Sequence, residues 1–326
     1  MKEDAISRWS NPDVILVATN LVEGQTFLLH AMYQARLTRA IILLVHVIAP
    51  SSIRFDAPGG ESTVAFDHAM HAAQLKLDEF AEEFQFEGVV CETIVLTGDP
   101  AAQISYVAKS RAVDRVIVAA RYESGLTRTV EPSVAEKLIE TVDMPVCFIG
   151  RRAHPSPACA APLGGVLCAT SLHLGSLKAV SFASALAELN HAQLTLLHVL
   201  DTEGMSEEER QRMRFAARTR LCASVPAEAK HKDHHNFLIR EGDPASIILA
   251  ESALRDPAFI ILGSHHSQMV SPLLNGVVRR VIQESQSPVI TINSDVTSSA
   301  REIHELSTYG KSNVVRERTS TGSMSP

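Results

Sequence analysis

The chain has 326 residues, of which 45% are hydrophobic and 21% charged, a composition typical of a soluble globular protein. Its formal net charge of −7 argues against a nucleic acid or an anionic membrane surface as partner. Its length predicts about two domains. The five cysteines lack the spacing of metal ligands, and an odd number without a signal peptide predicts free thiols in a reducing cytoplasm.

Residues 1–12 form a polar N-terminal arm that precedes a first domain over residues 13–150. In this domain short apolar runs alternate with amphipathic stretches, the longest of which is Ala65–Phe84. Continuous apolar runs are typical of parallel strands covered on both faces. The predicted strands are Val14–Ala18, Ile41–Val47, Val89–Leu96, Arg115–Ala119 and Val146–Ile149.

Residues 151–164 contain three prolines and small side chains, which predicts a linker. A second domain over residues 165–293 repeats the alternation of the first. Residues 294–326 are rich in Ser, Thr and charge and are interpreted as a flexible tail, with a short helix near Arg301–Leu306. The predicted strands of the second domain are Val166–Thr170, Gln193–Val199, Asn236–Arg240, Phe259–Leu262 and Val289–Ile292.

The two halves share four segments in the same order, which indicates a duplicated domain. The alternation of strands and helices predicts two tandem doubly wound α/β domains. The second and third segments lie further apart in the first half, which predicts an insertion in the loop Ala49–Ser62. The matching pairs are Val14–Thr19 with Gly165–Thr170, Leu44–Val47 with Leu197–Leu200, Gly98–Ala101 with Gly242–Ala245, and Met144–Val146 with Ser287–Val289.

These segments, together with Ser133–Leu138 and Ile261–Ser264, resemble the universal stress protein family in each half. The resemblance implies a five-stranded parallel sheet in the order 3-2-1-4-5, with helices on both faces. Family members commonly dimerise along the fifth strand. We therefore expect the two halves to pair within the chain as a pseudo-dimer, and a homodimer of the whole chain is a further expectation.

Family members that bind ATP carry Gly, two residues, Gly, nine residues, then Gly-Ser or Gly-Thr, and an Asp after the first strand. Such glycines let backbone N–H groups approach phosphates closely. In the first half only the serine of this pattern is kept, and Pro132 has no N–H to donate. We expect no nucleotide at this site. The matching positions are Asn20, Ala119, Tyr122, Pro132 and Ser133.

The second half keeps more of the pattern, with Gly263, Ser264 and Gly276 in place. His266 stands at the middle glycine, Val277 at the hydroxyl position and Ser171 at the aspartate position. An anion could rest on a helix that opens at Gly276. The favoured interpretation is a solvated loop with structural glycines, and the alternative is a site for ATP with Mg²⁺.

Two loops carry Gly-Asp-Pro, in which Asp99 and Asp243 are predicted to cap a helix that begins at the proline. Gly242 also lies at the ligand end of the sheet, so a ligand contact there is an additional expectation. His46 and His198 occupy equivalent strand positions, which favours a shared structural role. The other paired histidines lack converging ligands, so we predict no metal site.

No nucleophile with a paired base is visible, and neither a Walker lysine motif nor Gly-x-Gly-x-x-Gly occurs. The leading hypothesis is therefore a non-enzymatic stress-response protein with degenerate nucleotide sites. The first alternative is an adenine-nucleotide sensor that binds through the second domain and relays occupancy through the tail. A weak nucleotide hydrolase is the last alternative.

Overall fold

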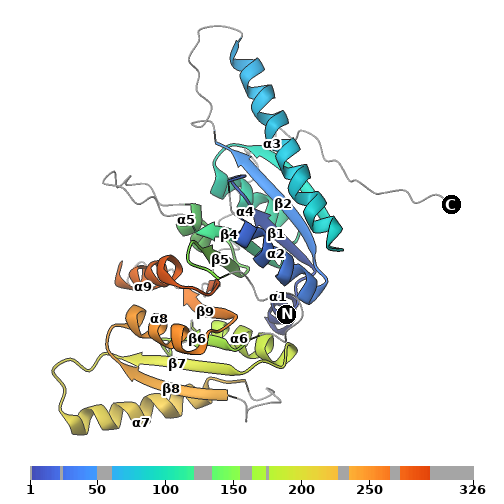
Figure 1. The fold of residues 1–326 in the computed structure, drawn as a ribbon. Coiled ribbons are helices and arrows are strands. Elements are labelled where there is room, and N and C mark those ends of the chain that lie inside the picture. The colour runs from blue at the N-terminus through green and yellow to red at the C-terminus, as the bar shows by residue number, and fades with distance from the viewer. Residues whose placement is uncertain are drawn as a thin grey trace.

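The computed structural model describes residues 2–22, 25–49, 61–120, 134–154, 164–173, 176–226, 235–264 and 272–293. All ten strands in these ranges belong to one sheet in the order β3-β2-β1-β4-β5-β10-β9-β6-β7-β8 (Figure 1). The two domains therefore share one continuous sheet.

The first half alternates helix and strand, as the apolar runs predict. Central residues of β1 are fully buried because helices cover both faces of the sheet. The elements are α1 (Lys2–Ser10), β1 (Val14–Ala18), α2 (Gln25–Thr38), β2 (Ile41–Ile48), α3 (Glu61–Phe86), β3 (Cys91–Thr97), α4 (Pro100–Ser110), β4 (Arg115–Ala120), α5 (Val134–Thr141) and β5 (Val146–Gly150).

The second half repeats this succession. Neighbouring strands inside each half are parallel. The order 3-2-1-4-5 predicted for each domain is thus confirmed in both. The elements are β6 (Val166–Ala169), α6 (Leu177–Leu189), β7 (Leu194–Leu200), α7 (Glu207–Ala223), β8 (His235–Glu241), α8 (Pro244–Arg255), β9 (Phe259–Ser264), α9 (Pro272–Glu284) and β10 (Val289–Asn293).

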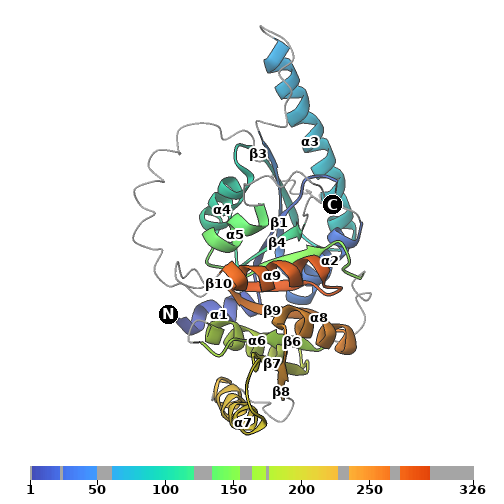
Figure 2. The ribbon, with the colours of Figure 1, turned by 90° about the vertical axis from the view of Figure 1, so that its left-hand side faces the viewer.

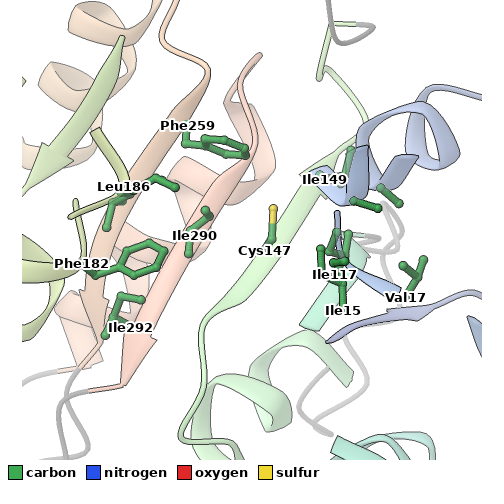
Figure 3. Close-up of a cluster of buried hydrophobic side chains, with 14 of the residues drawn as sticks. Ile15, Val17, Ile117, Cys147, Ile149, Phe182, Leu186, Phe259, Ile290 and Ile292 are labelled. Atoms are coloured by element: carbon green, nitrogen blue, oxygen red, sulfur yellow. The ribbon is translucent and has the colours of Figure 1, made fainter. Parts of the chain in front are cut away.

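The two domains meet where β5 pairs with β10 in antiparallel register, with Cys147 opposite Ile290. These are the fifth strands of their domains, so the halves fit the expected intrachain pseudo-dimer. Buried side chains lie on both sides of this junction (Figure 3). One core covers the face beneath α2, α3, α6 and α7, and the other covers the face beneath α4, α5, α8 and α9.

The pseudo-twofold relation brings the end of each fifth strand against the last helix of the opposite domain. Asn293, at the end of β10, donates from its amide to the carbonyl oxygens of Ile139 and Val142, at 3.5 and 3.4 Å. Gly150, at the end of β5, approaches the equivalent carbonyls of α9 so closely that a Cβ would lie 2.9 Å from the Ile282 oxygen. The glycine therefore permits this close packing.

The N-terminal arm, for which no regular structure was predicted, forms helix α1 and packs against α6 of the second domain. Arg8 forms a 2.5 Å ion pair with the buried Asp114. The fully buried Arg115 donates to the Trp9 oxygen in the last turn of α1, at 2.6 Å. Lys178 of α6 lies over the Trp9 ring, 4.6 Å from its centre. Helix α1 thus bridges the two domains.

The insertion expected in the loop Ala49–Ser62 agrees with the element bounds, since twelve residues (49–60) separate β2 from α3 but only six (201–206) separate β7 from α7. Helix α3 has 26 residues, whereas its counterpart α7 has 17. The first turns of α3 extend beyond the sheet (Figure 1). The additional length of the first half therefore lies both in the connection before α3 and in α3 itself. Residues 50–60 of the expected loop lie outside the described residues, as do most of the linker and the whole tail.

We predict that Gly150→Ala lowers the free energy of unfolding by about 1–3 kcal/mol, because the new methyl group overpacks the carboxyl end of α9. Gly165→Ala is the matched control, since its Cβ would lie 3.4 Å from the Gln193 oxygen, an ordinary contact. Chemical denaturation measures both. Equal stability of the two variants would contradict the close approach at Gly150.

Candidate functional site

The candidate residues of the second domain lie at the carboxyl edge of the sheet, where α/β proteins bind ligands. Strands β6 and β9 are neighbours, with Ala169 opposite Leu262. Ser171 therefore follows β6 beside Gly263 and Ser264, which end β9. In the first domain β1 and β4 are neighbours in the same way, which places Asn20 next to the end of β4, where Ala119 lies.

A threonine turn ends the first strand of each domain. Thr19 accepts from the backbone N–H of Leu21 at 2.9 Å, and Thr170 accepts from that of Leu172 at 3.1 Å. Both leucines adopt left-handed backbone, with φ of 66° and 62°. In the first domain Asn20 uses its side-chain oxygen to accept from Val22 N–H at 3.0 Å. This oxygen closes the turn where the family's aspartate would meet a base.

The two equivalent histidines hold these turns. His46 donates from Nδ1 to the backbone carbonyl oxygen of Thr19, and His198 donates from Nδ1 to that of Thr170, both at 2.8 Å. The expected shared structural role is confirmed. Burial lowers the pKa of His198, and the nearby charges of Arg220 and His173 lower it further. Arg220 itself donates to the Leu172 oxygen at 2.9 Å, which fixes it beside the turn.

The Gly-Asp-Pro loops have the predicted capping geometry. Asp99 and Asp243 accept from the third residue of α4 and α8, each at 2.9 Å, and a proline begins each helix. Gly98 and Gly242 have φ of 130° and 128°, which favours glycine strongly. The backbone conformation alone therefore accounts for a glycine at position 242, without a ligand contact.

Each capping aspartate also holds the last helix of its own domain. Asp99 pairs with Lys137 of α5 at 3.0 Å, and Asp243 pairs with Arg280 of α9 at 2.7 Å. Hydrogen bonds lower the pKa of both carboxyl groups, chiefly from the backbone for Asp99 and from Ser246 for Asp243. They stay ionised as structural anions.

Gly263 has a packing role that does not involve a ligand. A Cβ at this position would lie 3.3 Å from the Cα of Ser176, at the start of α6. Thr170 and Ser176 hydroxyl oxygens are 2.7 Å apart, which draws this helix start towards the sheet. In the first domain Ala119 occupies the equivalent place and packs its methyl group against the core. The close approach of Ser176 thus accounts for a glycine at position 263.

Gly276 does not open a helix, contrary to the expectation from the family pattern. Helix α9 begins at Pro272, so Gly276 and Val277 lie inside it. Gly276 is exposed, and a Cβ there would meet nothing within 4 Å. Val277 packs against the core. The backbone N–H groups of both residues are directed along the helix, where intrahelical bonding satisfies them.

Several predicted residues lie outside the described part of the chain. They are Tyr122, Pro132 and Ser133 of the first domain and His266 of the second. Within the described ranges, no three His, Cys, Asp or Glu residues are arranged to hold a metal ion. Also within those ranges, no helix has the length and apolar character needed to span a membrane.

Comparison with known proteins identifies the family of both halves. A model of the universal stress protein family matches residues 12–149 and again residues 164–293. The chain belongs to the universal stress protein family. A search of curated proteins found no match.

Solved structures of the family share the tandem architecture. A universal stress protein from Archaeoglobus fulgidus is 18% identical, covers 88% of this chain and 98% of its own, and superposes with a TM-score of 0.65. A putative universal stress protein from Pseudomonas aeruginosa is 20% identical, with coverages of 88% and 95% and a TM-score of 0.57. At these identities the likeness shows the fold alone.

Sequence reasoning missed three residues of this edge: Thr170, Ser176 and Arg220. Thr170 could have been found from the sequence, because Ala-Thr ends the first strand in both halves. The sequence holds no such indication for Ser176 and Arg220, because the packing of α6 and α7 against the sheet brings them to its carboxyl edge.

We predict that acidification destabilises the protein partly through His198. The unfolded residue titrates near its ordinary value of 6.5, while in the folded protein its pKa is lower. Its contribution to stability is complete above about pH 6.5 and is lost as the pH falls towards the folded pKa. Buried His30 shifts in the same direction, also because of burial.

Thermal unfolding of wild type and His198→Asn, from about pH 7.5 to about pH 5.5, measures this effect. Asparagine keeps an N–H donor near the Thr170 oxygen but does not titrate. The variant should show a shallower fall of Tm with pH than wild type, and exposed His71→Asn is the control. Identical slopes for all three proteins would refute the assignment.

Proposed function

We propose that this chain is a non-enzymatic, cytoplasmic stress-response protein, a tandem scaffold whose two nucleotide sites are degenerate. The observation that carries the proposal is the position of Gly276 inside α9, which begins at Pro272. A phosphate-binding glycine needs free backbone N–H groups at a loop or helix start. A glycine inside a helix does not offer them.

The first domain is proposed not to bind nucleotide. The side-chain oxygen of Asn20 accepts from Val22, and Ala119 places a methyl group at the position of the first glycine. Both features take up groups or space that a nucleotide would need.

The polar groups at the carboxyl edge already have structural partners, which supports a role without catalysis. His198 donates to the carbonyl oxygen of Thr170, and Arg220 donates to that of Leu172. Asp243 accepts from Arg280. A general base must instead lie within reach of a substrate proton.

The alternative is an adenine-nucleotide sensor in the second domain that binds ATP with Mg²⁺ and signals through residues 294–326. What favours it is the guanidinium of Arg220 near the edge where Ser171 and Gly263 lie side by side. A cation in such a place attracts an anionic ligand.

Titration with ATP and Mg²⁺, followed by calorimetry and by thermal shift, separates the two proposals. We expect no stabilisation at millimolar nucleotide. A ligand present at 100 times its Kd would stabilise the fold by about 2.7 kcal/mol. A shift of that size would overturn the degenerate-site proposal and support the sensor.

Gly276→Ala tests the carrying observation separately. Because the residue is exposed inside a helix, alanine should raise the free energy of unfolding by roughly 0.5–1 kcal/mol. If Gly276 instead lined a phosphate loop, the methyl group would abolish any ATP-dependent shift and bring no such gain. Chemical denaturation with and without ATP reads both outcomes from one variant.

A further inference from the structure

The two ends of the ten-stranded sheet carry equivalent helices of opposite charge. Helix α3 packs against edge strand β3, and helix α7 packs against edge strand β8. Figures 1 and 2 show them at opposite ends of the molecule. The fifth strands already pair with each other inside the chain. The strand pairing that we expect to join family members is thus occupied within the chain, so contact with another copy would use a different surface, and the two ends of the sheet are candidates.

The exposed surface of α3 is acidic, and we call it the acidic end. It carries Asp67, Asp78, Glu79, Glu82 and Glu83 against one lysine, Lys76, which pairs with Glu79. Within the part of the chain that the structure describes, the side chains of Glu82 and Glu83 form neither an ion pair nor a hydrogen bond.

Two exposed apolar side chains precede and follow the four carboxylates between Asp78 and Glu83. Leu75 is 54% exposed and Phe86 is 89% exposed. Exposed apolar groups next to charge are typical of surfaces that another protein covers.

The surface of α7 beyond its first turn is basic, and we call it the basic end. Its carboxylates are confined to Glu207–Glu209. Phe215 is 76% exposed and stands one helical turn from both Arg212 and Arg218. The arginines of this helix are Arg210, Arg212, Arg214, Arg218 and Arg220.

Two arginines of the basic end remain available to a partner. Arg212 pairs only with Glu208, one helical turn away, and both side chains are largely exposed. Such a pair contributes little and exchanges readily. Arg218 reaches one carbonyl, that of Phe237, at 3.4 Å. Arg214, in contrast, is held by Glu241 and Glu207.

We propose that the basic end of one chain docks on the acidic end of a second copy. Two acidic ends would repel each other, as would two basic ends, so the contact joins unlike surfaces. Helix α7 is about 25 Å long and fits along α3, which is about 39 Å long. Phe215 meets the apolar side chains beside the glutamates. A contact between unlike surfaces leads to open chains or closed rings rather than twofold dimers.

The proposal predicts self-association that weakens with salt, because exposed charges are screened beyond a distance of about 10 Å at 0.1 M. Sedimentation velocity of the full chain at about 100 μM measures it in about 20 mM and about 500 mM NaCl. The average mass should exceed the 35.4 kDa of one chain at low salt and return to it at high salt. A monomer under both conditions, or a salt-independent dimer, would overturn the proposal.

Charge reversal identifies the surfaces. Glu82→Arg/Glu83→Arg removes the net negative charge of the acidic end, and Arg212→Glu/Arg218→Glu makes the net charge of α7 negative, so each variant alone should stay monomeric at low salt. An equimolar mixture should associate again, because the unchanged basic end of the first variant can dock on the unchanged acidic end of the second. Arg151→Glu/Arg152→Glu changes exposed arginines away from both helices and should associate like wild type.

Failure of the mixture to associate, or loss of association in the Arg151/Arg152 control, would refute the assignment of the two ends. Circular dichroism checks that all variants fold. These results are independent of nucleotide binding, so the proposal stands or falls separately from the proposed function.

Discussion

The antiparallel pairing of β5 with β10 is the constraint on which the rest of the architecture depends. Each domain is a parallel sheet, so this one antiparallel junction points the carboxyl edges of the two domains in opposite directions. It also brings the last helix of each domain against the final strand of the other. The junction is not symmetric in detail, because Asn293 binds the helix carbonyls on one side while Gly150 lets the helix approach on the other. Duplication followed by divergence can adjust one copy of a contact without disturbing its equivalent.

A buried charge breaks the symmetry further. Arg115 begins β4, and the equivalent first residue of β9 is Phe259. Desolvation lowers the pKa of Arg115 to about 10, so the group remains a cation at neutral pH. Its charge is accommodated by the Trp9 carbonyl, by Gln34 at 3.0 Å and by the Phe182 ring. An unpaired buried charge would be strongly destabilising. Helix α1 is therefore part of the folded core, which explains why a polar segment outside the repeat is ordered.

The strands, their order and the helix caps could be predicted because they depend on local patterns. Apolar runs mark β1 to β5, and Gly-Asp-Pro specifies a left-handed glycine, a cap and a helix start together. Helix α1 could not be predicted from a local pattern, because its position depends on the ion pair between Arg8 and Asp114, which are far apart in the sequence. The start of α9 was misplaced for a different reason. Ser271-Pro272 is a helix-start signal in the sequence, but the family pattern predicted that the helix begins at Gly276.

The candidate site shows why a retained glycine is weak evidence for a ligand. A Cβ at Gly263 would lie 3.3 Å from the Cα of Ser176, Gly242 has a φ of 128°, and Gly276 is exposed inside α9. Packing accounts for Gly263 and backbone conformation for Gly242, whereas at Gly276 neither requires a glycine. Two side chains that do reach the carboxyl edge are His198 of β7 and Arg220 of α7. Neither residue belongs to the glycine pattern of ATP-binding family members, and both donate hydrogen bonds to the turn that ends β6. The turn that ends β6 therefore gives His198 and Arg220 a structural role that requires no ligand.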